Sequence, residues 1–379
     1  MCIAGRLGLV AALVACVMGT SLPVAAKEYV VVGSYGNKLH LVDPVALKVV
    51  RTYDVPGPAT GPTEITPSPD GRVVYVVTNR WMSVSGIDLD SGKEVFRADL
   101  ATDEVRVHAL FGLDISPDGK SLYVYEQRAR KKLDRFEGLD PAIAVYRTDA
   151  GTTAKPERMI NAPRQVQQIA VSTDGRTIYA QGIDIYAIDV ASGTVRETIP
   201  VAHWKRAGYG PAESMAWLGE QLNASGMYAM AFYAEKTGTA GTAPVAQDAD
   251  PPARIRDAGV LSINLKTGAS EFDVVGPESD MPQLASMSAN PQNPHEVFGL
   301  GAELFKVDLV AKRVVAHAPT NALLFYVIAV SGDGQKIYAG GGHCRVGVYE
   351  TKDLSTIGIV ELPNCAVMGQ SSLRIVNRP

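Results

Sequence analysis

The stretch Ser68-Pro69-Asp70-Gly71, followed after one arginine by Val73-Val74-Tyr75-Val76-Val77, decides the fold. An Asp-Gly pair supplies the positive φ of a tight hairpin turn, and the β-branched and aromatic residues beside it favour paired strands. A fifth, degenerate copy of the pattern begins at Ser288, before Val297-Phe298. The other three full copies, each Ser-x-Asp-Gly before a β-rich run, begin at Ser116, Ser172 and Ser331.

A second repeated element lies downstream of the first. Its fullest form is Ile87-Asp88-Leu89-Asp90-Ser91-Gly92, a strand that runs into a turn. Two hairpins in each repeat give four strands, which is the make-up of a propeller blade. Related copies occupy Ile188–Gly193 and Ile263–Gly268, with shortened versions at Val307–Leu309 and Val42–Pro44.

The repeats predict an all-β fold, a seven-bladed β-propeller of four-stranded antiparallel blades that fills residues 27–379 as one domain. The competing β-sandwich would require the near-identical hairpins to be coincidental. A last strand, Ser372-Leu373-Arg374-Ile375-Val376, is expected to pair with the first blade and close the ring, which removes an exposed sheet edge. The expected blades are 28–57, 62–102, 110–162, 166–202, 212–276, 283–320 and 325–363.

The first 26 residues have the pattern of a secretory signal. Arg6 precedes an apolar run from Leu7 to Met18, and small residues lead up to Ala26. The apolar run is shorter than the roughly 20 residues of a membrane-spanning helix. We therefore expect cleavage after Ala26 and a periplasmic protein. An alternative is a lipobox ending at Cys16, which would tether the chain to a membrane through a lipid.

Composition and motifs exclude several classes of function. Removal of Arg6 lowers the net charge from −4 to −5, which disfavours a nucleic-acid partner. The sequence has no C-x-x-C-H haem motif, no G-x-S-x-G elbow, no P-loop and no dinucleotide fingerprint. Its six histidines are scattered, and none lies within four residues of another. We expect no metal site and no catalytic residue on this chain.

Two cysteines remain after signal removal, Cys344 and Cys365. An isolated pair in an oxidising compartment is most simply a disulfide. Metal binding with the adjacent His343 is the alternative, but it would provide too few ligands.

Two insertions interrupt the repeat. The first, Arg128–Phe136, holds five basic residues in nine. It is either a solvated loop or a docking element for an acidic partner. The second, Thr237–Ala258, is rich in Gly, Ala, Pro and Thr and is expected to be a long loop.

Short motifs throughout the mature chain resemble the propeller (β) subunit of quinohemoprotein amine dehydrogenase. The fullest is Arg106-Val107-His108-Ala109-Leu110-Phe111-Gly112, followed by Ile115–Lys120. The cysteine pair and the length of the second insertion depart from that family. Further matches are Phe136-Glu137, Ala162–Gln165, Ala202–Trp204, Gly226-Met227, Phe232-Tyr233 and Ser372–Arg374.

The resemblance implies a subunit of a periplasmic complex that oxidises primary amines to aldehydes and ammonia. In that family a small γ subunit carries cysteine tryptophylquinone, and an α subunit carries two c-type haems that pass electrons to a soluble acceptor. The propeller holds the small subunit and helps to wall the substrate pocket, and it binds no cofactor itself.

Residues facing that partner are expected on the loops that connect blades. For the aromatic candidates the alternative is ordinary packing between blades. Stand-alone periplasmic propellers that act as binding proteins, lactonase-like hydrolases or haem d1 proteins are the competing functions. The candidates are Arg106, Phe111, Tyr125, Arg164, Trp204 and Tyr326.

Overall fold

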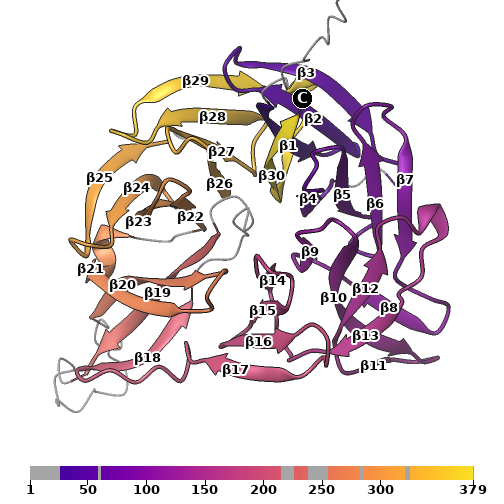
Figure 1. Ribbon diagram of the computed structural model, residues 1–379, viewed down its shortest axis with the longest axis horizontal. Helices are drawn as coiled ribbons and strands as arrows, with labels where there is room; N and C mark the ends of the chain where they lie inside the picture. The colour runs from indigo at the N-terminus through magenta and orange to yellow at the C-terminus, as the bar shows by residue number, and fades with distance from the viewer. Residues whose placement is uncertain are drawn as a thin grey trace, which may run out of the picture.

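The computed structural model describes residues 26–58, 61–214, 226–237, 255–281, 285–320 and 325–378. Their strands form seven antiparallel sheets set around a central axis (Figure 1), which confirms the predicted seven-bladed propeller. Nearly all of the expected signal sequence, Cys16 included, lies outside the described residues, as does 238–254 of the second insertion. Among the described residues, no helix has the length and apolar character needed to cross a bilayer.

Each blade runs from an inner to an outer strand, and the chain passes through the blades in order. Blade 1 holds β30 (Met368–Arg378), β1 (Lys27–Ser34), β2 (Lys38–Asp43) and β3 (Lys48–Asp54). Blade 2 holds β4 (Ile65–Pro67), β5 (Val73–Thr78), β6 (Ser83–Asp88) and β7 (Glu94–Asp99). Blade 3 holds β9 (Leu113–Ile115), β10 (Ser121–Lys131), β12 (Ala142–Arg147) and β13 (Arg158–Asn161), with β8 (Val105–His108) and β11 (Phe136–Gly138) added to β10.

The remaining four blades have four strands each. Blade 4 holds β14 (Gln168–Val171), β15 (Thr177–Gln181), β16 (Ile185–Asp189) and β17 (Val195–Ile199). Blade 5 holds β18 (Tyr209–Ser214), β19 (Met227–Lys236), β20 (Arg256–Asn264) and β21 (Ser270–Pro277). Blade 6 holds β22 (Ser286–Asn290), β23 (Asn293–Leu300), β24 (Glu303–Asp308) and β25 (Arg313–Pro319). Blade 7 holds β26 (Val327–Val330), β27 (Lys336–Gly340), β28 (Arg345–Glu350) and β29 (Thr356–Glu361).

Short 3₁₀ turns occur at three places among these residues. They are η1 (Gly151–Thr153), η2 (Glu278–Asp280) and η3 (Pro363–Cys365).

The four Ser-x-Asp-Gly turns share one geometry. In the first, the Ser68 hydroxyl donates to Asp70 at 2.5 Å and accepts the amide of Val73 at 2.9 Å, while the amide of Gly71 donates to the Ser68 carbonyl. The glycine has φ +68°, a conformation that is easy only for glycine. The same hydroxyl-to-aspartate bond recurs at 2.6, 2.6 and 2.5 Å in the copies that begin at Ser116, Ser172 and Ser331.

The carboxyl-terminal strand closes the ring. β30 pairs antiparallel with β1, with Val30 opposite Ile375 and Val32 opposite Leu373. β30 also reaches blade 2, where the buried Arg374 guanidinium binds the Glu64 carboxylate. Blade 1 therefore contains strands from both ends of the chain, as the sequence predicts. Unfolding of β30 would leave β1 without its inner neighbour.

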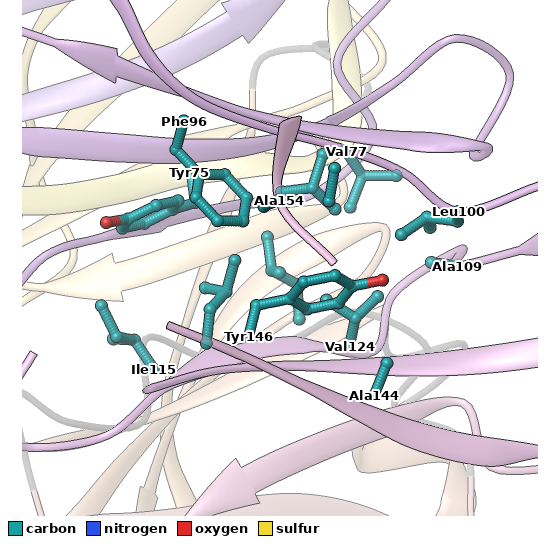
Figure 2. Packing of buried hydrophobic residues seen from close by; sticks show 14 of the residues in the cluster. Tyr75, Val77, Phe96, Leu100, Ala109, Ile115, Val124, Ala144, Tyr146 and Ala154 are labelled. Carbon is teal, nitrogen blue, oxygen red and sulfur yellow. The ribbon is translucent and has the colours of Figure 1, made fainter. Parts of the chain in front are cut away.

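The core lies between blades. In the cluster between blades 2 and 3, Phe96 stands edge-on to both Tyr75 and Tyr146, with ring centroids 5.5 and 6.1 Å apart (Figure 2). The same cluster includes small residues such as Ala144 and Ala154 (Figure 2). Large side chains from one sheet thus pack into the next, and this packing fixes the blades relative to one another.

Cys344, which precedes β28, and Cys365 of η3 form a disulfide in the last blade. Cys344 is buried at 1% exposure, whereas Cys365 is exposed. The bond ties the link that leads into β30 to blade 7, beside the closure of the ring.

Candidate functional site

The two ends of the channel differ in sequence. In a four-stranded antiparallel blade, the turn between the first two strands and the turn between the last two lie at one end. All the Ser-x-Asp-Gly turns therefore lie at this end, which we name the hairpin face. The turns between middle strands and the links between blades lie at the other end, the connecting face. Connecting segments differ from blade to blade, which makes this face the place for a specific site.

By this topology all six predicted site residues belong to the connecting face. Arg106 and Phe111 lie on the link from blade 2 to blade 3, Arg164 on the next link, and Trp204 and Tyr326 on later ones. Tyr125 lies near the end of the blade-core part of β10.

A cavity of about 430 Å³ opens on the connecting face. Its lining comes from blades 2, 3 and 4 and from β30, so it lies close to the axis, where non-adjacent blades meet. Two of the predicted residues, Phe111 and Tyr125, line it. We call it the Trp81 pocket; its lining is Trp81, Leu110, Phe111, Tyr125, Gln127, Val166, Gln167 and Gln370.

The wall formed by Phe111 and Tyr125 depends on close backbone approach. The amide of Tyr125 donates to the carbonyl of Gly112 at 2.7 Å, and a Cβ on Gly112 would stand 2.5 Å from the Tyr125 Cβ. The Tyr125 hydroxyl donates to the Pro163 carbonyl at 3.0 Å, which joins blade 3 to the next link. Burial raises the pKa of Tyr125, so this hydroxyl stays neutral at physiological pH. Glycine at position 112 is therefore needed for this wall of the pocket.

Trp81 reaches the pocket from an unusual turn between β5 and β6. Asn79, Arg80 and Trp81 have φ values of 52°, 53° and 69°, all in the left-handed region. Each non-glycine residue there costs roughly 1 kcal/mol. The turn is held because the carbonyl of Trp81 accepts the amide of Ala109 at 2.8 Å, and the Trp81 ring packs edge-on against His108 at 5.5 Å. The backbone is therefore strained in the turn that carries this indole.

Three arginines lie close in the chain to residues that line the pocket or contact its lining. Arg80 adjoins Trp81, is exposed, and has no hydrogen-bond or ion-pair partner within the described ranges. Arg106 donates to His108 at 3.1 Å and lies over the Phe136 ring at 5.7 Å. Arg164 pairs with exposed Asp140 at 2.7 Å. The pocket itself is neutral, and the cations of the connecting face near it are these arginines.

The last two predicted residues have different settings. Tyr326 is half-buried, and a Cβ on Gly341 would meet its Cβ at 3.2 Å and the carbonyl of Gln370 at 2.9 Å, so Tyr326 neighbours the pocket. Trp204 lies elsewhere, stacked on Phe272 at 5.6 Å and edge-on to Phe232 at 5.2 Å. Trp204 is partly buried and packs against the core cluster of blades 4 and 5.

The basic insertion is a strand pair rather than a loop. β10 runs on past the blade to Lys131 and pairs with β8 and β11, which forms a short arm. Its cations have partners in the chain: Arg128 faces Glu126 at 3.9 Å, Arg130 and Lys132 share Glu137, and Arg135 faces Asp134. The tip is apolar as well as basic, since Leu133 is fully exposed and Phe136 is 58% exposed. Alternation of charge along paired strands explains why this run is ordered.

At the hairpin face the channel holds a second cavity of about 430 Å³. Glu64, Asp114, Gln168 and Arg374 line it together with the hairpin turns. The Asp114 carboxylate accepts the amides of Ile115 and Val171 at 2.8 and 2.7 Å, so it ties blade 3 to blade 4. Glu64 and Arg374 bind each other where β30 closes the ring. Within the described ranges, no group of three or more His, Cys, Asp and Glu side chains gathers as a metal site would.

Sequence reasoning missed six of the eight lining residues, namely Trp81, Leu110, Gln127, Val166, Gln167 and Gln370. The sequence gives one indication of Trp81, because the turn Asn79-Arg80-Trp81 contains neither glycine nor proline. Gln127, Gln167 and Gln370 had none, because an isolated glutamine in a loop is unremarkable.

The sequence matches no protein-family model and no curated protein. Among solved structures it is similar to the hydrazine synthase of Kuenenia stuttgartiensis, with a TM-score of 0.52 and 17% identity over 89% of this chain and 99% of that one. It is also similar to a functionally unknown protein from Desulfotomaculum acetoxidans DSM 771, with a TM-score of 0.59 and 11% identity over 93% of this chain and 100% of that one. At these identities the likeness shows the propeller fold alone.

Proposed function

We propose that this chain is the non-catalytic propeller subunit of a periplasmic quinohemoprotein amine dehydrogenase. Its connecting face would hold the small quinone-bearing γ subunit and help to wall the amine pocket. The Trp81 pocket carries this proposal, because a cavity with an apolar floor and a neutral amide rim suits another protein's surface. The sequence resemblance, whose fullest motif includes Phe111 in this pocket, supplies the type of complex.

The cofactors of such a complex would belong to partner chains. Cys344 and Cys365, the two cysteines after residue 26, are bonded to each other. Neither offers a free thiol to tether c-type haem or to build cysteine tryptophylquinone. Amine oxidation to aldehyde and ammonia would take place at the small subunit's quinone, and the electrons would pass to the di-haem α subunit. This chain's task is to position those groups.

Affinity purification of the tagged full chain from the periplasm of its native host tests the proposal. We expect a small protein that stains for quinone and a protein with c-type haem absorbance to copurify, together with amine-dependent dye reduction. A chain that elutes alone, without haem absorbance or quinone staining, would reject the proposal. Neighbouring genes for a di-haem cytochrome and a small Cys- and Trp-containing subunit would support it independently.

A stand-alone periplasmic binding protein is the second candidate, and the volume of the Trp81 pocket favours it. About 430 Å³ is within the range of small-molecule sites. In that case the purified chain would be monomeric and would retain a small molecule that mass spectrometry detects after denaturation.

A further inference from the structure

We infer that the Trp81 pocket takes one aromatic or leucine-sized side chain from a partner loop whose flanking residues are acidic. This inference rests on the proposed function, and it names the chemistry of the partner. It concerns an anchoring contact rather than a substrate or a cofactor.

The floor of the pocket sets the size and polarity of the anchor. Trp81, Leu110, Phe111 and Val166 are apolar, and the Tyr125 hydroxyl is already engaged with Pro163. A charged or strongly polar group on this floor would lose its hydration without compensation. An aromatic side chain gains most, because it buries a large area and finds rings in several orientations.

The rim of the pocket is suited to binding the main chain of the partner loop. Gln127, Gln167 and Gln370 are exposed and neutral, and they come from three different parts of the fold. Each primary amide offers two donors and one acceptor, which matches the donor and acceptor of a peptide group. Three such amides around one apolar cavity can bind the backbone on both sides of an inserted side chain.

The charged side chains near the pocket determine which residues are favoured on either side of the partner's anchor. Arg80 has no acidic partner among the described residues, and the Arg106 side chain donates to His108 and lies over the Phe136 ring. Arg164 has Asp140, yet both side chains are exposed and can exchange partners. These neighbouring arginines favour carboxylates beside the anchor, and complementary charge speeds association and suppresses wrong partners.

The pocket is built before the partner arrives. Three consecutive left-handed residues fix the Trp81 turn, and the main-chain bond from Ala109 to Trp81 holds it against blade 3. A preorganised wall costs little ordering entropy on binding. Strain retained at a surface turn indicates that the position of the indole matters to function.

Capped tripeptides test the anchor chemistry on the full-length protein. Titrations with acetylated and amidated Glu-Phe-Glu, Lys-Phe-Lys and Glu-Ala-Glu, followed by ligand-observed NMR, should give binding in that order. We expect Glu-Phe-Glu to bind about tenfold more tightly than Lys-Phe-Lys at low salt, with a smaller ratio at high salt. Equal binding of Glu-Ala-Glu, preference for Lys-Phe-Lys, or binding of a neutral disaccharide in place of all three peptides would overturn the inference.

Two variants locate the peptide. Trp81→Ala should abolish binding of Glu-Phe-Glu. Gln370→Glu, an exposed change that preserves the fold, should reverse the preference between the two charged peptides. The same change on the hairpin face, Gln335→Glu, is the matched control and should leave both affinities within twofold. Reversal by Gln335→Glu, or no response to Gln370→Glu, would refute the location.

The native complex separates this inference from the proposed function. If the small subunit copurifies with wild type and equally with Trp81→Ala and Gln370→Glu, the anchor is wrong and the scaffold role stands. If no subunit copurifies but Glu-Phe-Glu binds as expected, the anchor chemistry stands and the amine dehydrogenase role fails.

Discussion

Replacement of Glu64 by glutamine should change how the stability of the ring depends on pH. Glu64 is buried at 3% exposure where β30 closes onto blade 2, and one of its oxygens binds the Arg374 guanidinium. Burial raises the pKa of Glu64 from 4.5 to about 7, and the nearby Arg374 only partly offsets this rise. Below about pH 7 the folded protein therefore favours the neutral carboxyl.

The magnitude follows from linkage. Between pH 4.5 and 7 the folded chain retains a proton on Glu64 that the unfolded chain has lost, so the folded state binds more protons and its stability falls as pH rises through this window. Each pKa unit corresponds to about 1.4 kcal/mol, so the stability that Glu64 removes between pH 4.5 and 8 is about 3 kcal/mol. The side chain is almost fully buried, so solvent screening does not reduce this figure.

Denaturant unfolding of wild type and Glu64→Gln at several pH values from 4.5 to 8 isolates the effect. Other titrating groups are common to both proteins and cancel in the difference. The free energy of unfolding of the variant, minus that of wild type, should increase by about 3 kcal/mol over this range. The ion pair with Arg374 forms only with ionised Glu64, so its effect is already contained in the raised pKa. The change from carboxyl to amide adds only a constant offset, because neither the amide nor Arg374 titrates in this range. A flat difference, or one that falls with pH, would show that Arg374 outweighs burial and would refute the reasoning.

Other predictions concern stability. Replacing Cys344 and Cys365 by serine should lower the free energy of unfolding by about 3 kcal/mol, because the bond closes a loop with a sequence separation of 21; a loss below about 1 kcal/mol in denaturant titrations would contradict this. Gly71→Ala should destabilise far more than Gly119→Ala, although both glycines have φ near 70°, because only the Cβ at position 71 would meet the Asn377 carbonyl, at 2.1 Å. Similar melting temperatures for the two alanine variants would count against that contact. Deletion of β30 should abolish cooperative thermal unfolding, since β1 loses its inner neighbour; a sharp transition in circular dichroism would disprove its role in closure.

The turns could be read from the sequence because their physics is local. Ser68, Asp70 and Gly71 lie within four residues and make the hairpin with each other, so the pattern carries its own explanation. Ring closure was also predictable, since a strand left over after seven repeats has one unpaired edge to join. Both predictions needed only the interactions between residues close together in the chain and a count of the repeats.

The arm formed by β8, β10 and β11 was not predicted from the sequence. A run that contains Arg128, Arg130 and Lys132, considered by itself, indicates a solvated loop, because like charges repel one another. In the structure those residues face Glu126 and Glu137 across or along paired strands, and β10 simply continues. The partner strand β11 lies just beyond the charge run, and the charge count alone did not include it.

The pocket could not be found by any local pattern, and the reason is geometric. Gln370 and Gln167 are about two hundred residues apart in the chain, yet both line one cavity because β30 joins blade 1 and brings its start to the axis. Trp81 carries the one readable hint, because a turn of three left-handed residues without glycine is costly and must be maintained by something outside itself. The repeats that identify a propeller lie on its hairpin face. A specific site must then be sought where the sequences of the blades differ, in the turns between middle strands and the links between blades. In this chain that search leads to Trp81 and Phe111, and from them to the glutamines that only the closed ring brings together.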